Sequence, residues 1–263
     1  MEELFIIKVG GNVIDDDKNL NAFLEKFHEI KAHKILIHGG GKIATEISAK
    51  LGIETKMVDG KRITDKETMK IVTMVYAGLI NKTIVAKLNT MGTNALGICG
   101  ADMNLIPAVK RPVTEIDFGY VGDILTYKIP AKQWAGLLAQ NSCPVVAPIT
   151  SDNTGALLNT NADTIASALA QALSKLYSVS LIYCFEKDGV LQNPNDENSA
   201  IPVIKPVTYT DLKNRGIISK GMLPKMNNSW EALNNGVLKV IIGNAMKLDK
   251  LINSIEGTRL VLK

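Results

Sequence analysis

The sequence predicts an α/β fold in which a mostly parallel sheet is covered by helices on both faces. Short runs of apolar, often β-branched residues alternate with segments whose apolar residues recur at helical spacing. This order is typical of βαβ units, whose parallel strands share one sheet. We expect the strands at 4–9, 34–38, 96–99, 145–149, 179–184 and 237–242.

The predicted helices lie between these strands. Apolar residues recur at helical spacing over 20–30, 71–88 and 165–176. Thr64 and Glu67 have the spacing of a capping box, which predicts that Thr64 begins the second of these helices. The alternation lapses over 111–127, where we expect a small β excursion or lid, and over 194–206, a polar loop bounded by prolines.

Composition favours a globular protein without nucleic-acid or membrane partners. The 263 residues are 46% hydrophobic, and the net charge is only +4 with scattered basic residues. We identify no apolar run long enough to cross a bilayer and no signal-peptide pattern, and therefore expect a cytoplasmic protein. Cys99, Cys143 and Cys184 lack metal-ligand spacing and are expected to be buried, reduced thiols. We expect a single domain over 1–263 with an N-terminal lobe of about 1–155 and a C-terminal lobe of about 156–263.

Two glycine-rich turns follow predicted strands. They are 8–11 (Lys-Val-Gly-Gly) and 38–41 (His-Gly-Gly-Gly). Glycines let backbone N–H groups approach a ligand closely, and the N-terminus of a following helix adds partial positive charge. Because ligands bind outside the carboxyl ends of the strands in such sheets, both turns are expected to hold a phosphorylated ligand.

The common nucleotide-binding motifs are missing from the chain. It contains neither the GxxxxGK[ST] motif of P-loop proteins nor the GxGxxG motif of dinucleotide-binding proteins. The first absence argues against a P-loop kinase, and the second weakens the case for a dinucleotide-dependent dehydrogenase. Phosphate binding must depend on other residues.

Six short motifs follow one another along nearly the whole chain. They are Lys8-Val-Gly-Gly, His38-Gly-Gly-Gly, Gly60-Lys-Arg62-Ile-Thr64, Gly119-Tyr-Val-Gly-Asp123, Asn159-Thr-Asn-Ala-Asp163 and Gly221-Met-Leu-Pro-Lys225-Met. In this order they resemble the acetylglutamate kinases, a branch of the amino acid kinase family. The resemblance implies an open α/β/α sandwich with a mostly parallel central sheet. It also implies ATP-dependent phosphorylation of the side-chain carboxylate of N-acetyl-L-glutamate, an early step of arginine biosynthesis.

The resemblance assigns catalytic roles to Lys8, Lys225 and Asp163. It implies that the two lysines flank the transferring phosphoryl group and that Asp163 orients them. Lys8 ends a strand and is expected to point into the ligand crevice. Without the resemblance, Lys225 would be interpreted as an exposed helical lysine, and Asp163 as a cap or dipole partner at a helix start.

The acyl-glutamate is assigned mainly to residues of the N-terminal lobe. Arg62 can grip a carboxylate with two parallel hydrogen bonds, and the resemblance places it on the α-carboxylate. The same resemblance implies that Asn159 binds the substrate and that the backbone N–H groups of Gly40 and Gly41 hold the reacting carboxylate. This lobe is also expected to form the contacts of a homodimer.

ATP is assigned by the resemblance mainly to the C-terminal lobe, with Mg²⁺ bridging its phosphates. The residues expected to contact the nucleotide are Gly10, Gly11, Glu186, Gly189, Ile218 and Ser219. The chain departs from the family pattern in this region. It has the bulky, charged segment 185–188 and Lys220, where relatives have smaller and acidic residues.

The chemistry of the proposed reaction agrees with the residues that are present. A carboxylate is already deprotonated at neutral pH and needs no general base, so no catalytic histidine is expected. The obstacle is repulsion between the anionic acid and the anionic triphosphate. Two unit charges about 4 Å apart repel by roughly 4 kcal/mol at an effective dielectric constant near 20, so lysines and N–H dipoles are required.

Three alternatives to this assignment stay open. An N-succinyl-L-glutamate kinase would need a cation near the acyl tail. A catalytically inactive nucleotide-binding regulatory protein is compatible with the altered segment 185–188. An oxidoreductase with a degenerate dinucleotide-binding turn would bind NADH and not ATP.

Overall fold

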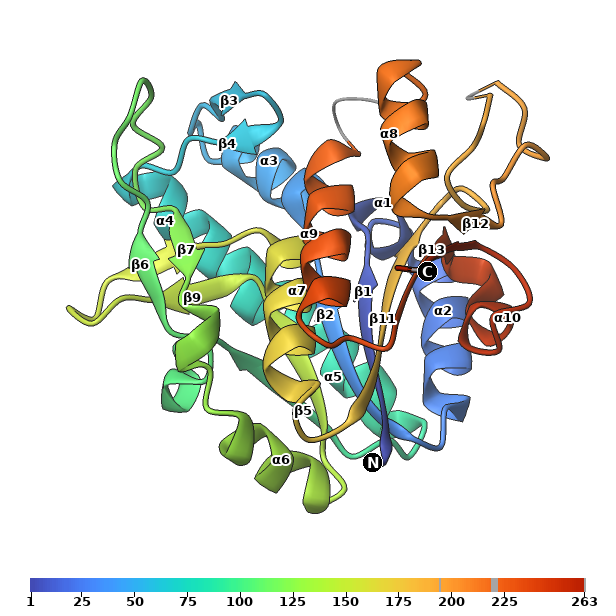
Figure 1. Cartoon of the computed structure of the whole chain (residues 1–263). Helices are drawn as coiled ribbons and strands as arrows, with labels where there is room; N and C mark the ends of the chain where they lie inside the picture. The colour runs from blue at the N-terminus through green and yellow to red at the C-terminus, as the bar shows by residue number, and fades with distance from the viewer. Residues whose placement is uncertain (194, 219–221, 263) are drawn as a thin grey trace.

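The centre of the structure is an eight-stranded sheet with the order β12-β14-β13-β11-β1-β2-β8-β5 (Figure 1). This computed structural model describes residues 1–193, 195–218 and 222–262. Neighbouring strands are parallel from β13 to β5, whereas β14 runs antiparallel to β13 and parallel to β12. The strands are β1 (Glu3–Val9), β2 (His33–His38), β5 (Ala95–Cys99), β8 (Cys143–Ala147), β11 (Ser178–Phe185), β12 (Val203–Ile204), β13 (Lys239–Asn244) and β14 (Thr258–Leu260).

Every predicted strand is confirmed, with its ends within about two residues of the prediction, and one predicted run is divided between two strands. The run predicted as 145–149 ends at Ala147, and Ile149 begins a separate strand, β9 (Ile149–Ser151), which pairs with β10 (Leu157–Asn159). The short strands β12, at the edge of the sheet, and β14, beside it, were not predicted. They contain only two and three residues, too few to show a period.

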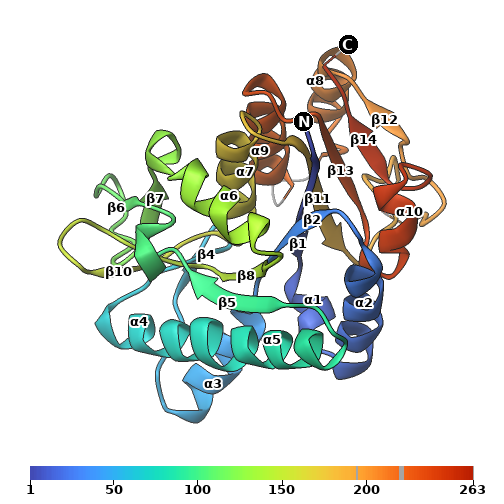
Figure 2. The same ribbon diagram turned by 90° about the horizontal axis from the view of Figure 1, so that it is seen from below.

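Helices cover both faces of the sheet (Figures 1 and 2), as predicted. Leu4 and Ile6 of β1 point into the core shared with α6, α7, α8 and α9, whereas Phe5 and Ile7 point into the core shared with α1, α2, α4, α5 and α10. The helices are α1 (Gly11–Ile14), α2 (Asp17–Glu29), α3 (Gly41–Lys50), α4 (Lys66–Thr73), α5 (Asn81–Thr90), α6 (Ala131–Ala139), α7 (Ala162–Leu173), α8 (Pro206–Asn214), α9 (Leu223–Asn234) and α10 (Leu248–Ile252).

The helix predicted over 71–88 is a longer helical stretch, Lys66–Thr90, that contains a π-helical segment, Met74–Ile80. The predicted capping box is wrong, because Asp65 is the N-cap and its side chain accepts a hydrogen bond from the N–H of Thr68. This stretch also corrects our expectation about membranes, since it is long and apolar enough to cross a bilayer, with a mean hydropathy of 1.4. Its buried apolar residues pack against the sheet, as in a core helix (Figure 2).

Small two-stranded sheets surround the carboxyl ends of the main strands. The predicted β excursion is confirmed as the hairpin of β6 (Ala108–Lys110) and β7 (Gly122–Ile124). A second hairpin, β3 (Met57–Val58) and β4 (Lys61–Arg62), carries part of the Gly-Lys-Arg-Ile-Thr motif. Cys143 and Cys184 are buried free thiols whose pKa values burial raises to about 12, whereas Cys99 is only partly buried.

Candidate active site

The two glycine turns lie side by side at the carboxyl ends of β1 and β2. Val9 is the register partner of His38, and the Gly39 N–H donates a hydrogen bond to the Val9 carbonyl over 3.3 Å. Gly11 and Gly41 are the first residues of α1 and α3. Both turns therefore present helix N-termini at one edge of the sheet, where anions are favoured.

A cavity of about 470 Å³ opens at this edge. The predicted site residues that line it are Lys8, Gly11, Gly40, Gly41, Arg62, Asn159 and Asp163. Pro224 and Asn228 of α9 also line the cavity. Residues from both halves of the sequence thus meet in one cavity.

Asp163 lies between the two predicted catalytic lysines. Its Oδ1 is 2.9 Å from Lys8 Nζ, and its Oδ2 is 3.9 Å from Lys225 Nζ. Lys8 is on β1, Asp163 is in the first turn of α7, and Lys225 is in the first turn of α9. The side chain that caps α7 is Asn161, which accepts from the Thr164 N–H, so the alternative interpretation of Asp163 as the cap is wrong.

Burial and charge shift the pKa values of Asp163 and Lys225, and the side chains of Lys8, Asp163 and Lys225 are 13–19% exposed. Burial alone would raise the pKa of Asp163, but Lys8 and Lys225 outweigh it and the pKa lies below the usual value. Burial lowers the pKa of Lys225, and the attraction of Asp163 opposes that change. The carboxylate therefore carries a negative charge at neutral pH and holds two lysines, of which Lys8 lines the cavity and Lys225 follows the cavity residue Pro224.

Two aromatic side chains pack against Lys225. Its Nζ lies 5.3 Å from the ring centre of Tyr183 and 5.2 Å from that of Phe185. The Tyr183 hydroxyl also donates to the carbonyl oxygen of Asp163 over 3.1 Å. Tyr183 was not predicted as a site residue, because an aromatic residue in an apolar strand indicates only burial in the core.

Arg62 is 8% exposed and is anchored beside the second glycine turn. Its Nη2 donates to the Gly41 carbonyl and to Thr45 Oγ1, each over 2.8 Å, and its Nη1 donates to Thr55 Oγ1 over 3.1 Å. A guanidinium has five N–H donors, so these bonds leave two for a ligand. The side chain is thus fixed by its neighbours while part of it faces the cavity.

Asn159 ends β10 and lies close to the Gly-Lys-Arg-Ile-Thr motif. Its Nδ2 donates to Thr64 Oγ1 over 3.0 Å. The backbone of Thr64 is held in turn by Phe118 and Tyr120, on either side of Gly119. Gly119 has a φ of +72°, and a Cβ there would collide with the Thr64 carbonyl. Glycine is therefore required at the point where the motifs meet.

Of the residues predicted to contact the nucleotide, only Gly11 lines this cavity among the described residues. The Gly10 N–H donates to the Cys184 carbonyl over 3.0 Å, so it serves the turn, and Gly11 is the residue of this turn that lines the cavity. Glu186 accepts a hydrogen bond from the Asn12 side chain, Gly189 packs against Thr258, and Ile218 is buried. Ser219 lies outside the described residues, as do Lys220 and Gly221. Nucleotide contacts at these positions stay a prediction.

Three further cavity residues were not among the predicted site residues: Lys61, Tyr76 and Arg111. Lys61 stands beside Arg62 in a motif that the sequence analysis quoted, so its position was a usable signal. Arg111 is paired with Asp123 over 2.7 Å. Tyr76 lies inside a helical pattern that predicts only core packing, and nothing in that pattern indicates the cavity.

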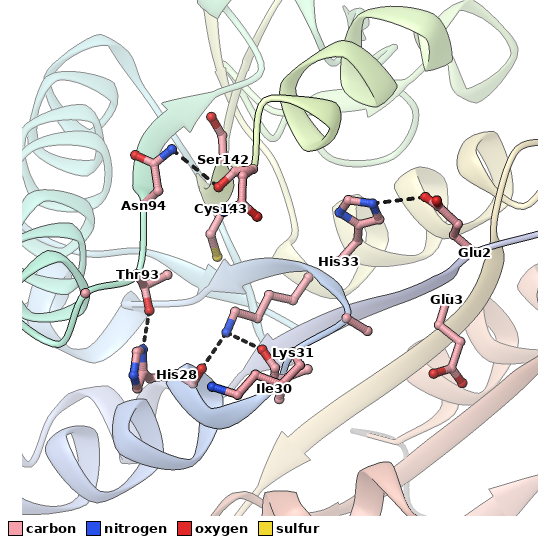
Figure 3. A pocket seen from close by; sticks show the side chains of 14 residues that line it. Glu2, Glu3, His28, Ile30, Lys31, His33, Thr93, Asn94, Ser142 and Cys143 are labelled. Atoms are coloured by element: carbon pink, nitrogen blue, oxygen red, sulfur yellow. Dashed lines mark hydrogen bonds and ion pairs between the residues drawn. The ribbon is translucent and has the colours of Figure 1, made fainter.

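A second cavity, of about 600 Å³, lies at the opposite, amino-terminal ends of the strands (Figure 3). Its polar groups bind one another. Lys34 Nζ donates to three backbone carbonyls at the end of α2, His33 contacts Glu2, and His28 contacts Thr93. These groups are already satisfied, and the cavity lies away from the strand ends that bind ligands in such sheets.

Comparison with known proteins identifies the family of this chain. Residues 3–244 match the model of the amino acid kinase family. The chain belongs to the amino acid kinase family. Among similar members, an acetylglutamate kinase from Cytophaga hutchinsonii is 54% identical over 264 residues, which cover 99% of each chain. An acetylglutamate kinase from Bacteroides thetaiotaomicron is 52% identical over 259 residues, which cover 98% of each chain.

Solved structures support the amino acid kinase fold. An N-acetylglutamate synthase from Neisseria gonorrhoeae, complexed with coenzyme A and N-acetyl-glutamate, superposes with a TM-score of 0.83 at 17% identity. The match covers 99% of this chain and 59% of that one. A carbamate kinase from Giardia lamblia bound to AMP-PNP superposes with a TM-score of 0.69 at 16% identity, over 100% and 99% of the two chains. The predicted fold class is therefore confirmed.

Proposed function

We propose that this amino acid kinase transfers the γ-phosphoryl group of ATP to the side-chain carboxylate of N-acetyl-L-glutamate, an early step of arginine biosynthesis. The names of relatives that are about half identical along the full chain support this substrate. The observation that carries the proposal is the placement of Lys8 and Lys225 on either side of Asp163. Lys8 lies near the end of β1, Asp163 lies in the first turn of α7, and Lys225 lies in the first turn of α9. Arg62 lines the same cavity.

The acceptor is bound through both of its carboxylates. The charge of Arg62 and its two free N–H donors, on Nε and Nη1, suit the α-carboxylate, because hydrogen bonds between a guanidinium and a carboxylate are charge-assisted. The N-terminus of α3, at Gly40 and Gly41, suits the side-chain carboxylate, which its N–H groups orient without a proton transfer. Asn159 supplies an amide within the same cavity. The acceptor is thereby held with its reacting oxygen toward Lys8.

Transfer needs charge neutralisation and no base. The ionised carboxylate attacks the γ-phosphorus, a new carboxyl–phosphate bond forms, the bond to the β,γ-bridging oxygen breaks, and ADP leaves. Lys8 and Lys225 offset the charge on the phosphoryl oxygens as it passes between acceptor and donor. Asp163 holds both ammonium groups in place through its two oxygens. Part of the barrier is removed because this arrangement exists before the substrates bind.

We propose MgATP as the phosphoryl donor. The carboxylate closest to the lysines, Asp163, is engaged by both of them, which suits a Mg²⁺ held by phosphate oxygens and water rather than by a protein cage. When bound, Mg²⁺ would neutralise part of the phosphate charge. Gly11, at the N-terminus of α1, is the residue of the first turn best placed for phosphate oxygens.

The test is a steady-state comparison of acceptors with MgATP: N-acetyl-L-glutamate, N-succinyl-L-glutamate, free glutamate and aspartate. Turnover with an N-acylated glutamate and none with the free amino acids is the expected result. Turnover with free glutamate or aspartate at a comparable kcat/KM would contradict the proposal.

N-succinyl-L-glutamate is the second candidate acceptor, and Lys61 is the residue that favours it. Lys61 lines the cavity beside Arg62 and has no carboxylate within 4.0 Å among the described residues. A succinyl group carries an additional carboxylate that such an ammonium group would attract. Under this proposal Lys61→Met lowers kcat/KM for the succinyl substrate by about tenfold and leaves the acetyl substrate unchanged. Equal effects on both substrates would remove Lys61 from the choice of acyl group.

We further propose a cytoplasmic homodimer. The supporting observation is an exposed apolar patch at the free edge of the sheet. Leu96 on the edge strand β5 is 39% exposed, and Met74 and Leu79 of the adjacent π-helical segment are 56% and 53% exposed. Light scattering on the purified protein should give twice the chain mass of 28.5 kDa, and a mass equal to one chain would contradict the proposal.

A further inference from the structure

Tyr76 is brought to the active-site cavity by the π-helical segment Met74–Ile80. A π-helical turn contains an extra residue compared with an α-helical turn, and it therefore changes which side chains face a neighbouring element. Here it places Val75, Tyr76 and Ile80 on the buried side of the helix. Tyr76 is 5% exposed, and its small exposed part lies in the cavity.

The Tyr76 ring packs behind the second glycine turn. A Cβ at Gly40, where φ is +145°, would lie 3.2 Å from Tyr76 Cδ1 and would collide with Ile80 Cδ1. A Cβ at Gly41 would lie 4.0 Å from the Tyr76 hydroxyl. The side chain therefore runs along the backbone of the turn that the proposed mechanism uses to hold the reacting carboxylate.

The Tyr76 hydroxyl also lies beside Arg62. Arg62 Nη2 donates to the Gly41 carbonyl over 2.8 Å, so the guanidinium and the hydroxyl meet at the same residue. Burial raises the pKa of Tyr76, and its interaction with the Arg62 guanidinium partly opposes that rise. A phenol in this place can accept a hydrogen bond from a guanidinium and keep its proton at any physiological pH.

We propose that Tyr76 is a positioning residue, which holds the Arg62 guanidinium and the Gly40–Gly41 turn in the arrangement that binds the acyl-glutamate. This inference rests on the proposed function. Tyr76 acts through Arg62 and the turn, and it takes no part in phosphoryl transfer. Its loss therefore weakens binding of the acceptor and spares both MgATP binding and the chemical step.

The test compares Tyr76→Phe, which removes only the hydroxyl, with the wild type and with Tyr127→Phe. Tyr127 is 81% exposed, so the same chemical change there serves as the control. We expect Tyr76→Phe to raise KM for the acyl-glutamate about tenfold, since a hydrogen bond to a charged group contributes about that factor or more. The kcat and the KM for MgATP should change less than threefold, and Tyr127→Phe should leave all three unchanged.

A double-mutant cycle with Arg62→Lys separates positioning from a general structural effect. If Tyr76 acts through Arg62, Tyr76→Phe adds less than threefold to KM in the Arg62→Lys background. An unchanged acceptor KM in Tyr76→Phe, an equal rise in both KM values, or full additivity in the cycle would each overturn the inference.

Calorimetric titration of N-acetyl-L-glutamate and N-succinyl-L-glutamate into the wild type distinguishes failure of the proposed function from failure of the role of Tyr76. Absence of binding by both ligands defeats the proposed function and this inference together, whereas wild-type binding with unchanged affinity in Tyr76→Phe defeats only the inference.

Discussion

The ammonium group of Lys8 lies 2.9 Å from Asp163 Oδ1. This ion pair joins the end of the central strand β1 to the first turn of α7. The other oxygen of Asp163 faces Lys225 from a third element, α9. One partly buried carboxylate thus aligns two cations that lie far apart in the sequence. This arrangement suits a reaction whose main barrier is repulsion between two anions.

Removal of either lysine should lower kcat far more than it alters KM. We expect Lys8→Ala and Lys225→Ala to reduce kcat by about 10² to 10³, because each removes a cation that stabilises the charge of the transferring group. Lys66→Ala, which changes an exposed lysine at the start of α4, is the control. Steady-state kinetics would exclude the proposed roles if both variants kept a kcat near that of the wild type.

Arg62→Lys should act mainly on acceptor binding. The substitution keeps the charge and removes the planar guanidinium with its several N–H donors, including the anchors to Gly41 and Thr45. We expect KM for the acyl-glutamate to rise about 10- to 100-fold, with a change below threefold in KM for MgATP. An acceptor KM that stays at the wild-type value would remove Arg62 from the substrate site.

His38, which precedes the second glycine turn, should make the stability depend on pH. It is fully buried, and burial lowers its pKa from 6.5 to about 4. The unfolded chain therefore binds a proton at higher pH than the folded chain. The free energy of unfolding should fall by roughly 3 kcal/mol through this residue as the pH drops from above 6.5 to about 4.

Urea unfolding across this pH range, compared between the wild type and His38→Gln, measures the contribution. The variant should lose less stability on acidification than the wild type, because its neutral amide has no proton to gain. Parallel curves for the wild type and His38→Gln would show that His38 is not the titrating group.

Gly119→Ala tests the junction between two motifs. Gly119 has a φ of +72°, and a methyl group there would collide with the Thr64 carbonyl. Gly155 has a φ of +86° but open space around it, so Gly155→Ala measures the backbone cost alone, about 1 kcal/mol. We expect Gly119→Ala to be clearly more destabilising than Gly155→Ala and to raise the acceptor KM, because Thr64 holds Asn159. Equal unfolding free energies for the two variants would contradict the steric argument.

Much of the fold could be predicted, because the buried strands are apolar runs and the helices between them have clear periodicity. The position of the site followed from the glycine turns at the ends of β1 and β2, without knowledge of any contact. The short strands β12 and β14 and the π-helical segment could not be predicted, because each depends on packing with distant parts of the chain. The cap at Asp65 was missed because Thr64, one residue earlier, has the same local signature.

The site was predicted best where a motif joins a charge to a strand or helix end. Lys8 and Asp163 are of this kind, and the structure brings them together with Lys225. Tyr76 and Tyr183 could not be predicted, since an aromatic residue in an apolar run indicates only burial. The predicted nucleotide contacts at Glu186, Gly189, Ile218 and Ser219 stay a prediction, because the first three do not line the described cavity and Ser219 lies outside the described residues.

Trapping of the product with hydroxylamine tests the central claim most directly. Incubation with MgATP, an N-acyl-L-glutamate and hydroxylamine should yield the hydroxamate of the side-chain carboxyl, with one ADP released for each hydroxamate formed. Lys8→Ala should lower this yield at least about 10²-fold under the same conditions. ADP release without hydroxamate, or a yield that Lys8→Ala leaves unchanged, would contradict phosphoryl transfer to the carboxylate between these lysines.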